Sequence, residues 1–384
     1  MIFDFDHPPD RRGSDSVKWG KYAGRDVLPM WVADMDFAAP PCVLDALHRR
    51  VDHGVFGYGS PPMSLAGAIT EALERDHGWA IDPDWLVWLP GLVSGLNIVC
   101  RAIGEPGDQV LTAVPVYPPF LSAPRYSQRR VTTVDLRRAE SRWVWDFGRL
   151  ERAVTPGSRL LMLCNPHNPV GRAFSRDELT SIAQIAERHD LVICSDEIHC
   201  GLVLDEEIRH IPIAMLGEAI AQRTITLMAP SKTWNIPGLG CAFAVVSNPK
   251  LRRQVLDAMH GIVPHANVLG YAATEAAYRD GEGWRRKLIE YLRVNADRVE
   301  QAIAGMPGLS TCRVEATYLA WIDARPLALR DPVRFFEDAG VGLSNGADFG
   351  SPGYLRLNFG CARSLLDLAL QRMHDAVLAR DVPT

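Results

Sequence analysis

The sequence has no apolar run approaching the roughly 18 residues that a membrane-spanning helix needs. Its opening residues, MIFDFDHPPDRRGSDS, are polar and lack the apolar core of a signal peptide. Positive charge is not concentrated either, since the formal net charge is -5 and there is no long run of lysine or arginine. The electrostatic footprint of a nucleic-acid binder is therefore missing. We expect a cytoplasmic protein that acts on a small molecule, with neither a nucleic acid nor a membrane as partner.

The eight cysteines include no CxxC pair, the spacing typical of zinc sites and redox motifs. Cys164, Cys194 and Cys241 lie in apolar, strand-like runs, which is where free thiols are commonly buried. His199 and Cys200 are adjacent, but side chains one residue apart point to different sides of a strand or helix. We expect buried free thiols and no metal site.

Short apolar runs alternate with segments of helical period, which indicates a parallel α/β fold. One such helical segment, 175–189, opens with the capping box of Ser175 and Glu178 and is expected to be a crossover helix. The expected strands are VLTAV (110–114), LLMLC (160–164), LVICS (191–195), TITLMA (224–229) and CAFAVV (241–246).

The pattern changes after residue 285. A long periodic helix over 283–305 is followed by the strand TYLAWID, a helix at 332–339, the strand YLRLNF and a closing helix. These elements are enough for a smaller α+β domain. With 384 residues, the length is typical of about two or three domains.

Four polar or aromatic residues directly follow predicted strands: Tyr117, Asn168, Asp196 and Lys232. In an open parallel sheet, ligands bind beyond the carboxyl ends of the strands. Pyridoxal phosphate (PLP) needs such a set, namely an amine, a carboxylate for its pyridine nitrogen, a donor near its phenolic oxygen and a flat side chain against its ring. The backbone N–H groups of the glycine-flanked turn 91–95 would hold its phosphate at the start of a helix.

Each of these residues also has a plainer explanation. The turn at 91–95 could simply lead into a helix, and Asp196 could cap a turn. Tyr117, between prolines, could pack within a loop, and Lys232 could be a surface lysine. The joint pattern is more specific than its members, because four unrelated groups fall at one sheet edge.

The order and spacing of NPxG at 168–171, Asp196 with a polar residue three positions later, and the pair Ser231 and Lys232 resemble the fold-type I PLP enzymes, the aspartate aminotransferase superfamily. The resemblance extends from about residue 28 to 378. Within that superfamily, the cystathionine β-lyase or C–S lyase branch is resembled by WVADMDF (31–37), FGYG (56–59), NPHNPVGR (165–172), SDEIH (195–199) and APSKTWNIPGL (229–239).

The resemblance implies a three-layer, PLP-transferase-like large domain with a mostly parallel central sheet over residues 48–284. It implies a smaller α+β domain made of residues 285–384 and of an N-terminal arm, 1–47. It also implies a role in methionine biosynthesis and a homodimer with shared active sites.

The same resemblance implies residue roles. Lys232 would bind PLP as an imine, Asp196 would pair with the pyridinium, Asn168 would bind the phenolic oxygen, and Tyr117 would stack on the ring. Arg356 would hold the substrate α-carboxylate, a role that suits its planar fork, although an ordinary surface ion pair is an alternative.

Further residues take roles from the same resemblance. Leu92, Val93 and Ser231 would contact the phosphate, Ala33 and Asn168 would contact the substrate, and His199 would lie at the cofactor. Tyr58 would reach the phosphate of the neighbouring subunit, although it could equally be a core aromatic.

Two positions depart from the aminotransferase pattern. Gly240 stands where many aminotransferases carry a phosphate-binding arginine, and His199 stands where they often have tyrosine. Both departures favour the lyase branch. They leave more of the phosphate charge to backbone amides, Ser231 and Tyr58.

The expected reaction is β-elimination of L-cystathionine-like substrates to pyruvate, ammonia and a thiol such as homocysteine. Lys232 would remove the Cα proton, and either Lys232 or Tyr58 would protonate the leaving sulfur. The alternatives are a class I/II aminotransferase with the same site and a PLP-binding protein whose main role is to bind a regulatory partner.

Overall fold

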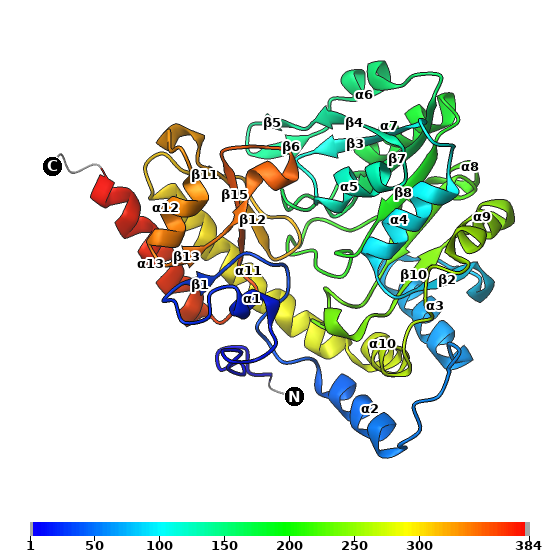
Figure 1. The fold of residues 1–384 in the computed structure, drawn as a ribbon, viewed down its shortest axis with the longest axis horizontal. Coiled ribbons are helices and arrows are strands. Elements are labelled where there is room, and N and C mark those ends of the chain that lie inside the picture. Colours follow the sequence, from blue (N-terminus) through cyan, green and yellow to red (C-terminus); the bar gives the residue numbers. More distant parts are fainter. Residues whose placement is uncertain (1–2, 381–384) are drawn as a thin grey trace.

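The computed structural model describes residues 3–380. Its larger sheet has seven strands in the order β2-β10-β9-β8-β7-β3-β4 (Figure 1). The five strands from β9 to β4 in this order are mutually parallel, whereas β10 is antiparallel to both of its neighbours. The strands are β2 (Leu86–Leu89), β3 (Gln109–Val114), β4 (Arg130–Asp135), β7 (Ser158–Cys164), β8 (Val192–Asp196), β9 (Thr224–Met228) and β10 (Ala242–Val245).

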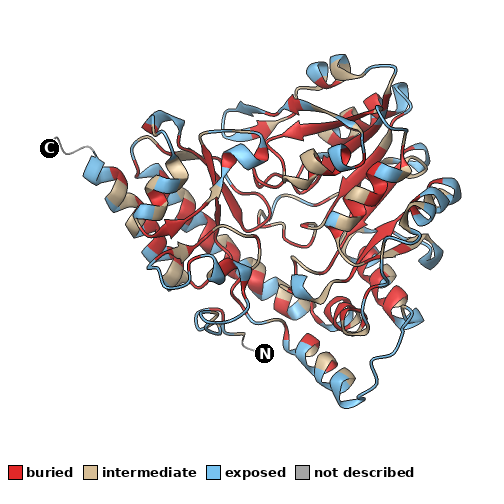
Figure 2. Ribbon diagram, in the orientation of Figure 1, coloured by how far each residue is buried: buried red, intermediate tan, exposed pale blue. Residues whose placement is uncertain are grey.

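Helices cover both faces of this sheet, which confirms the predicted α/β fold. In β7, Leu160 and Met162 pack under α4, α5 and α9, whereas Leu161 and Leu163 pack under α6, α7 and α8. Burial on both faces explains why the inner strands are continuous apolar runs, and Figure 2 shows these strands as largely buried. The helices are α4 (Leu92–Ala102), α5 (Pro119–Tyr126), α6 (Phe147–Ala153), α7 (Arg176–Arg188), α8 (Glu218–Ala221) and α9 (Pro249–Met259).

Helix α7 begins as predicted. The Ser175 side chain accepts a hydrogen bond from the Glu178 N–H, and the Glu178 carboxylate accepts one from the Ser175 N–H at 2.8 Å. The helix joins β7 to its parallel neighbour β8. It is therefore the crossover helix that the sequence indicates.

Strand β10 differs from the parallel pattern expected for its apolar run. The chain between β9 and β10 forms turns and the short 3₁₀-helix η3 (Pro237–Leu239). A parallel connection needs a longer crossover, usually a helix. Without one, the chain reverses direction, and this reversal carries Lys232.

The second sheet has four antiparallel strands in the order β11-β12-β15-β14. Its helices include α11, which runs diagonally from the smaller sheet towards α10 in Figure 1. The strands and helices of this part are β11 (Ser310–Thr311), β12 (Leu319–Asp323), β14 (Ser344–Asn345), β15 (Tyr354–Asn358), α11 (Glu282–Ala304), α12 (Pro332–Asp338) and α13 (Arg363–Arg380). The four elements predicted after residue 305 are thus confirmed.

The N-terminal residues join this second part, because β1 pairs in parallel with β13. Helix α10 packs against both α2 and α3. Buried side chains of all three helices belong to one hydrophobic cluster. The remaining regular elements are α1 (Val17–Gly20), β1 (Leu28–Pro29), α2 (Pro41–Asp52), α3 (Met63–His77), η1 (Pro83–Trp85), β5 (Arg137–Ala139), β6 (Arg142–Val144), η2 (Ile213–Leu216), α10 (Val268–Asp280), η4 (Arg325–Leu327), β13 (Val341–Gly342) and η5 (Gly346–Phe349).

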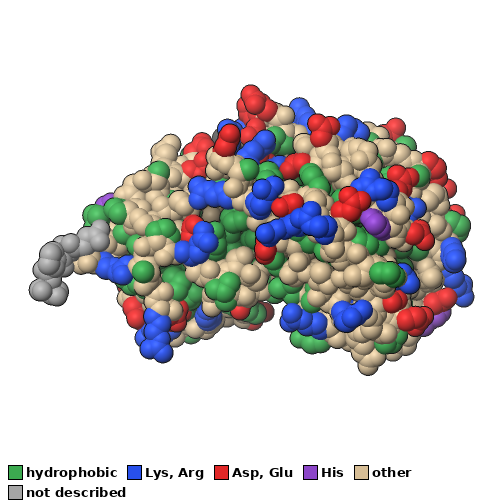
Figure 3. Space-filling model, turned by 90° about the horizontal axis from the view of Figure 1, so that it is seen from above, with side chains coloured by type: hydrophobic (Ala, Val, Ile, Leu, Met, Phe, Trp, Pro, Cys, Tyr) green, Lys and Arg blue, Asp and Glu red, His purple; other side chains and the backbone are tan. Residues whose placement is uncertain are grey.

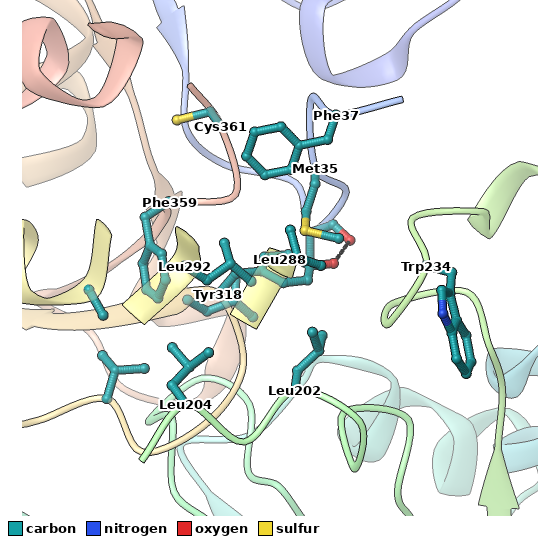
Figure 4. Packing of buried hydrophobic residues seen from close by; sticks show 14 of the residues in the cluster. Met35, Phe37, Leu202, Leu204, Trp234, Leu288, Leu292, Tyr318, Phe359 and Cys361 are labelled. Atoms are coloured by element: carbon teal, nitrogen blue, oxygen red, sulfur yellow. Dashed lines mark hydrogen bonds between the residues drawn. The ribbon is translucent and has the colours of Figure 1, made fainter. Parts of the chain in front are cut away.

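An irregular stretch, residues 31–37 (WVADMDF), lies between the two sheets and is called the 31–37 segment below. Met35 and Phe37 from this segment belong to the same buried cluster as Leu288 of α11 and Tyr318 (Figure 4). The segment has little regular structure, yet the side chains of Ala33, Met35, Asp36 and Phe37 are buried.

The surface mixes charges of both signs, as Figure 3 shows for one face. Within residues 3–380, no helix combines the length and apolar character needed to cross a membrane. All eight cysteines are free, and Cys164, Cys194 and Cys241 are buried as expected.

Candidate active site

A cavity of about 290 Å³ lies at the carboxyl ends of the parallel strands. It brings together the residues predicted at the strand ends with others from the turn at 91–94, from the 31–37 segment and from β15. The predicted residues that line it are Ala33, Leu92, Val93, Tyr117, Asn168, Asp196, His199, Ser231, Lys232 and Arg356.

The amine of Lys232 lies in the reversal between β9 and β10. Its Nζ donates a hydrogen bond to the carbonyl oxygen of Ala33 at 2.5 Å. Burial and the nearby Arg356 guanidinium lower the pKa of Lys232 to about 8, because both disfavour the ammonium form. A substantial share of this amine is therefore neutral near pH 8, as a nucleophile or general base requires.

Asp196 is the last residue of β8 and only 4% exposed. Its carboxylate accepts a hydrogen bond from the Ile198 N–H at 3.1 Å, and no hydrogen bond within residues 3–380 joins it to a cation. Burial raises the pKa of Asp196 to about 7. A buried carboxylate in this position is suited to a positively charged ring nitrogen, which would restore its ionised form.

Arg356 of β15 reaches the cavity from the smaller sheet. One terminal nitrogen donates to Asn168 Oδ1 at 3.0 Å and the other to the Trp31 carbonyl oxygen at 2.8 Å. The guanidinium is buried, lies over the Phe349 ring, and makes no ion pair with a described residue; its Nε has no partner there either. The surface ion pair considered from the sequence is therefore wrong, and this buried cation is suited to an anionic ligand.

Asn168 links the two sides of the cavity. Its side-chain oxygen accepts from Arg356, and its backbone oxygen accepts from the Tyr117 N–H at 3.1 Å. The amide NH₂ group is thereby left to donate to a ligand oxygen. Burial raises the pKa of the Tyr117 phenol, so its ring stays neutral.

The turn at 91–94 forms a cradle at the start of α4. The first intrahelical bond runs from the Gly95 N–H to the Gly91 oxygen at 3.1 Å, so the preceding N–H groups, from Leu92 to Ser94, are free of intrahelical partners. Backbone donors at a helix start bind phosphate well, and Ser231 lines the same cavity. Gly240 also lines it, with φ of +56°.

Taken together, these groups fit PLP. The cavity offers an amine for covalent attachment, a buried carboxylate without a cation bonded to it, and a set of backbone donors for a phosphate. The buried Arg356 adds a place for a carboxylate of an amino-acid substrate.

Two predicted residues behave differently from the rest. His199 lines the cavity, but its ring lies edge-on to Tyr318, its Nδ1 has no partner in the described chain, and burial lowers its pKa to about 3. Its imidazole is therefore neutral, and its contact with a cofactor stays a prediction. Tyr58 is fully exposed at 112% and lies outside the cavity of its own chain, so its role stays a prediction.

Tyr318 was not predicted as a site residue, because the sequence TYLAWID reads only as a strand. Its hydroxyl donates to the Ala33 carbonyl oxygen at 2.8 Å, and the residue is fully buried. Asn235 was missed as well. Its side chain bonds the backbone of Met35, and no sequence pattern signals such a contact.

Comparison with known proteins shows which family this chain resembles. The model of aminotransferase class I and II matches residues 25–373. Cystathionine beta-lyase PatB of Bacillus subtilis (strain 168) is 36% identical, over 97% of this chain and 99% of that protein.

Solved structures agree in fold. The structure of OvoB is 49% identical, with a TM-score of 0.96 over 98% of this chain and 99% of that one. A PLP-bound C–S lyase from Staphylococcus hominis is 30% identical, with a TM-score of 0.91 over 98% and 99%. The chain therefore belongs to the aminotransferase class I and II family, within its branch of carbon–sulfur lyases.

Proposed function

We propose that the protein is a PLP-dependent carbon–sulfur β-lyase that converts L-cystathionine-like substrates and one water molecule to pyruvate, ammonia and a thiol. The observation that carries this proposal is the meeting of the Lys232 amine with the buried Asp196 carboxylate in one cavity. The names of the relatives support the reaction class.

When bound, PLP supplies an electron sink that stabilises negative charge at the substrate Cα. Asp196 would keep the ring nitrogen protonated, and the ionised form of Asp196 would in turn be favoured by that cation. Asn168 would donate to the phenolic oxygen, and Tyr117 would lie against the ring. The N–H groups at the start of α4, with Ser231, would hold the phosphate.

The substrate would be oriented through its α-carboxylate by Arg356. Each hydrogen bond to a charged group contributes about 1.5–3 kcal/mol, and the fixed guanidinium plane limits the substrate to one orientation. Lys232, as a neutral amine, would take the Cα proton. The sulfur at Cβ then leaves as a thiolate, and its proton would come from Lys232 or Tyr58.

Tyr58 can act only if a second chain brings it to the cavity, so we also propose a homodimer with shared sites. Residues 54–62 have no regular structure, and they join α2 to α3. This stretch and its flanks expose Val55, Phe56, Tyr58 and Met63, each more than half exposed. Such a group of large apolar side chains is typical of an interaction surface.

Complementation tests the shared site. Tyr58→Phe and Lys232→Ala should each be strongly impaired alone. Mixed dimers would hold one intact site, so activity should return to about one quarter of wild type after statistical mixing. No recovery in a mixture shown to contain mixed dimers would mean that each site is built from one chain.

Product analysis tests the reaction. Purified holoenzyme incubated with L-cystathionine should release pyruvate, ammonia and homocysteine in equal amounts without an added keto acid. A strict requirement for a keto acid would overturn the lyase proposal and indicate an aminotransferase. Binding of PLP with negligible turnover of a panel of sulfur amino acids would favour the regulatory alternative.

Three finer points are part of this proposal. We place the protein in the cytoplasm and in methionine biosynthesis. We divide the chain into a large domain, 48–284, and a small domain of 1–47 with 285–384. The two separate sheets and the pairing of β1 with β13 support that division.

A further inference from the structure

The carbonyl oxygen of Ala33 accepts two hydrogen bonds inside the site. Lys232 Nζ donates one at 2.5 Å, and the Tyr318 hydroxyl donates the other at 2.8 Å. A peptide carbonyl has two lone pairs, so the two donors use its full capacity. Tyr318 is completely buried, and its ring is fixed by packing in the core (Figure 4).

The 31–37 segment that carries Ala33 is held from several directions. The Asn235 side chain accepts from the Met35 N–H and donates to the Met35 oxygen, both at 2.9 Å. The Asn358 amide donates to two further carbonyl oxygens of the segment, at 2.6 and 2.7 Å. Lys18, fully buried, donates to Asp36 at 2.8 Å. The Ala33 oxygen is therefore a fixed acceptor.

Backbone strain marks the residue before Tyr318. Thr317 has φ of +76° and is fully buried, an unusual conformation for a β-branched residue. Strain of this kind persists where the surroundings impose it, often at functional sites. The strained backbone at Thr317 indicates that the Tyr318 side chain has to lie in one particular place.

We propose that Tyr318 is a positioning residue, which together with the Ala33 carbonyl holds the amine of Lys232 whenever that amine is not bonded to the cofactor. An N–H of a neutral amine that is bonded to a fixed acceptor directs the nitrogen lone pair away from that acceptor. Here the other side is the cavity, where the substrate Cα would lie. The proposal rests on the proposed function, since it concerns the base of that reaction.

The proton balance of this step is simple. The neutral amine has two N–H bonds and one lone pair. When the lone pair takes the Cα proton, the amine becomes an ammonium with three N–H bonds, and the electron pair of the broken C–H bond stays with the substrate. The bond to the Ala33 oxygen is kept throughout, so the nitrogen does not have to move.

Tyr318 also affects how readily the amine stays neutral. A carbonyl that already accepts from Tyr318 is a weaker acceptor for an ammonium, and the hydroxyl proton repels a positive charge beside it. The charged and titratable groups around Lys232 are Arg356 from β15, Asp34 from the 31–37 segment, and Asp196 and His199 at the end of β8. None of these is altered when the hydroxyl alone is removed.

The test compares Tyr318→Phe with Tyr291→Phe. Tyr291 belongs to the same buried cluster, and its hydroxyl makes hydrogen bonds with Asp6 and Arg363 but none with Ala33. The control variant therefore also loses buried hydrogen bonds, but not the one at Ala33. Tyr318→Phe should lower kcat about tenfold or more with KM little changed. Tyr291→Phe should change both constants little.

A second measurement uses the cofactor-free protein, so it does not depend on which substrate is cleaved. The pKa of the Lys232 amine is measured by competitive acetylation with acetic anhydride across pH, with mass analysis of the peptide. Tyr318→Phe should raise that pKa by about half a unit or more. Incorporation of 3-fluorotyrosine at position 318, a stronger donor of nearly the same shape, should lower the pKa of the Lys232 amine. If Tyr318→Phe does not fold, the fluorotyrosine variant alone provides the test.

Opposite shifts for the two replacements support the positioning role. An amine pKa that neither replacement moves, or a kcat in Tyr318→Phe equal to that of Tyr291→Phe, would overturn it. Failure of the lyase proposal itself would appear separately, as wild-type protein that does not release pyruvate from any sulfur amino acid.

Discussion

The rim of the seven-stranded sheet and the 31–37 segment face the same cavity but contribute different chemistry. The rim contributes side chains: the amine of Lys232, the carboxylate of Asp196 and the amide of Asn168. The segment contributes backbone carbonyls, which accept from Lys232, Arg356 and Tyr318. The rim therefore carries the reacting groups, and the segment holds the end groups of Lys232 and Arg356 in place.

This difference predicts that substitutions at the rim abolish turnover. Substitutions around the 31–37 segment should instead change the geometry of the site and the stability of the protein. Four predictions test that contrast, beginning with the largest expected effect on turnover.

Replacement of Lys232 by alanine should reduce elimination by about 10³-fold or more, because the chain loses both the covalent attachment and the general base. Initial rates of pyruvate release measure the effect. Lys250→Ala, an exposed lysine on α9, is the matched control and should retain full activity. Substantial turnover by Lys232→Ala would remove this residue from the mechanism.

Replacement of Arg356 by lysine should lower kcat/KM about 10- to 100-fold, chiefly through KM, since an ammonium cannot form the paired bonds to a carboxylate. Steady-state kinetics with L-cystathionine report it. Arg325→Lys makes the same change in the smaller part of the chain, at an exposed arginine that pairs with Asp323, and should leave the kinetics unaltered. Equal kinetic constants for the two variants would contradict the carboxylate-binding role.

The capture of PLP by the cofactor-free protein should depend on pH through the Lys232 amine. Its pKa is lowered to about 8 by burial and by Arg356, and only the neutral form attacks the aldehyde. The rate should rise about tenfold per unit below pH 8 and level off above it. Stopped-flow absorbance measures this rate. A rate that climbs steeply to pH 10 would mean that the amine has an ordinary lysine pKa.

Replacement of Lys18 by methionine should affect turnover least and stability most. The ion pair of Lys18 with Asp36 is buried, with the two side chains 0% and 4% exposed. Arg11 stays paired with Asp36 at 2.9 Å, but the buried carboxylate loses one charged hydrogen bond, which should lower the free energy of unfolding by about 1.5–3 kcal/mol. Urea denaturation measures it, with Lys287→Met as control, because the pair of Lys287 with Glu290 is exposed.

In this variant kcat should fall less than in Lys232→Ala, since no reacting group is lost. A variant as stable as wild type would show that the arm formed by the first residues does not hold the 31–37 segment.

Most of the sheet and its rim could be predicted from sequence. Apolar runs such as LLMLC indicate strands buried on both faces, and the residue after each strand is then placed at the ligand-binding edge. The reversed direction of β10 was missed because an apolar run carries no information on strand direction. The same run of residues satisfies both pairings. The available signal was the connection after β9, which contains no crossover helix.

The resemblance placed Ala33 at the site, but the backbone contacts of the 31–37 segment could not be predicted, for a related reason. Backbone carbonyls are present at every residue, so nothing in the letters WVADMDF shows that Ala33 would meet Lys232 and Tyr318. Those contacts join residues 199 and 285 positions apart. Only the packing of the segment between the two sheets brings them together.

The most direct test of the account is the site of cofactor attachment. The chain has four other lysines, at positions 18, 21, 250 and 287, which serve as internal controls in one sample. Wild-type protein incubated with PLP, reduced with borohydride and digested should yield a single pyridoxyl adduct, on Lys232, in amounts equal to the protein chains. An adduct on any other lysine in place of Lys232, or none at all, would contradict the assignment of this cavity as the active site.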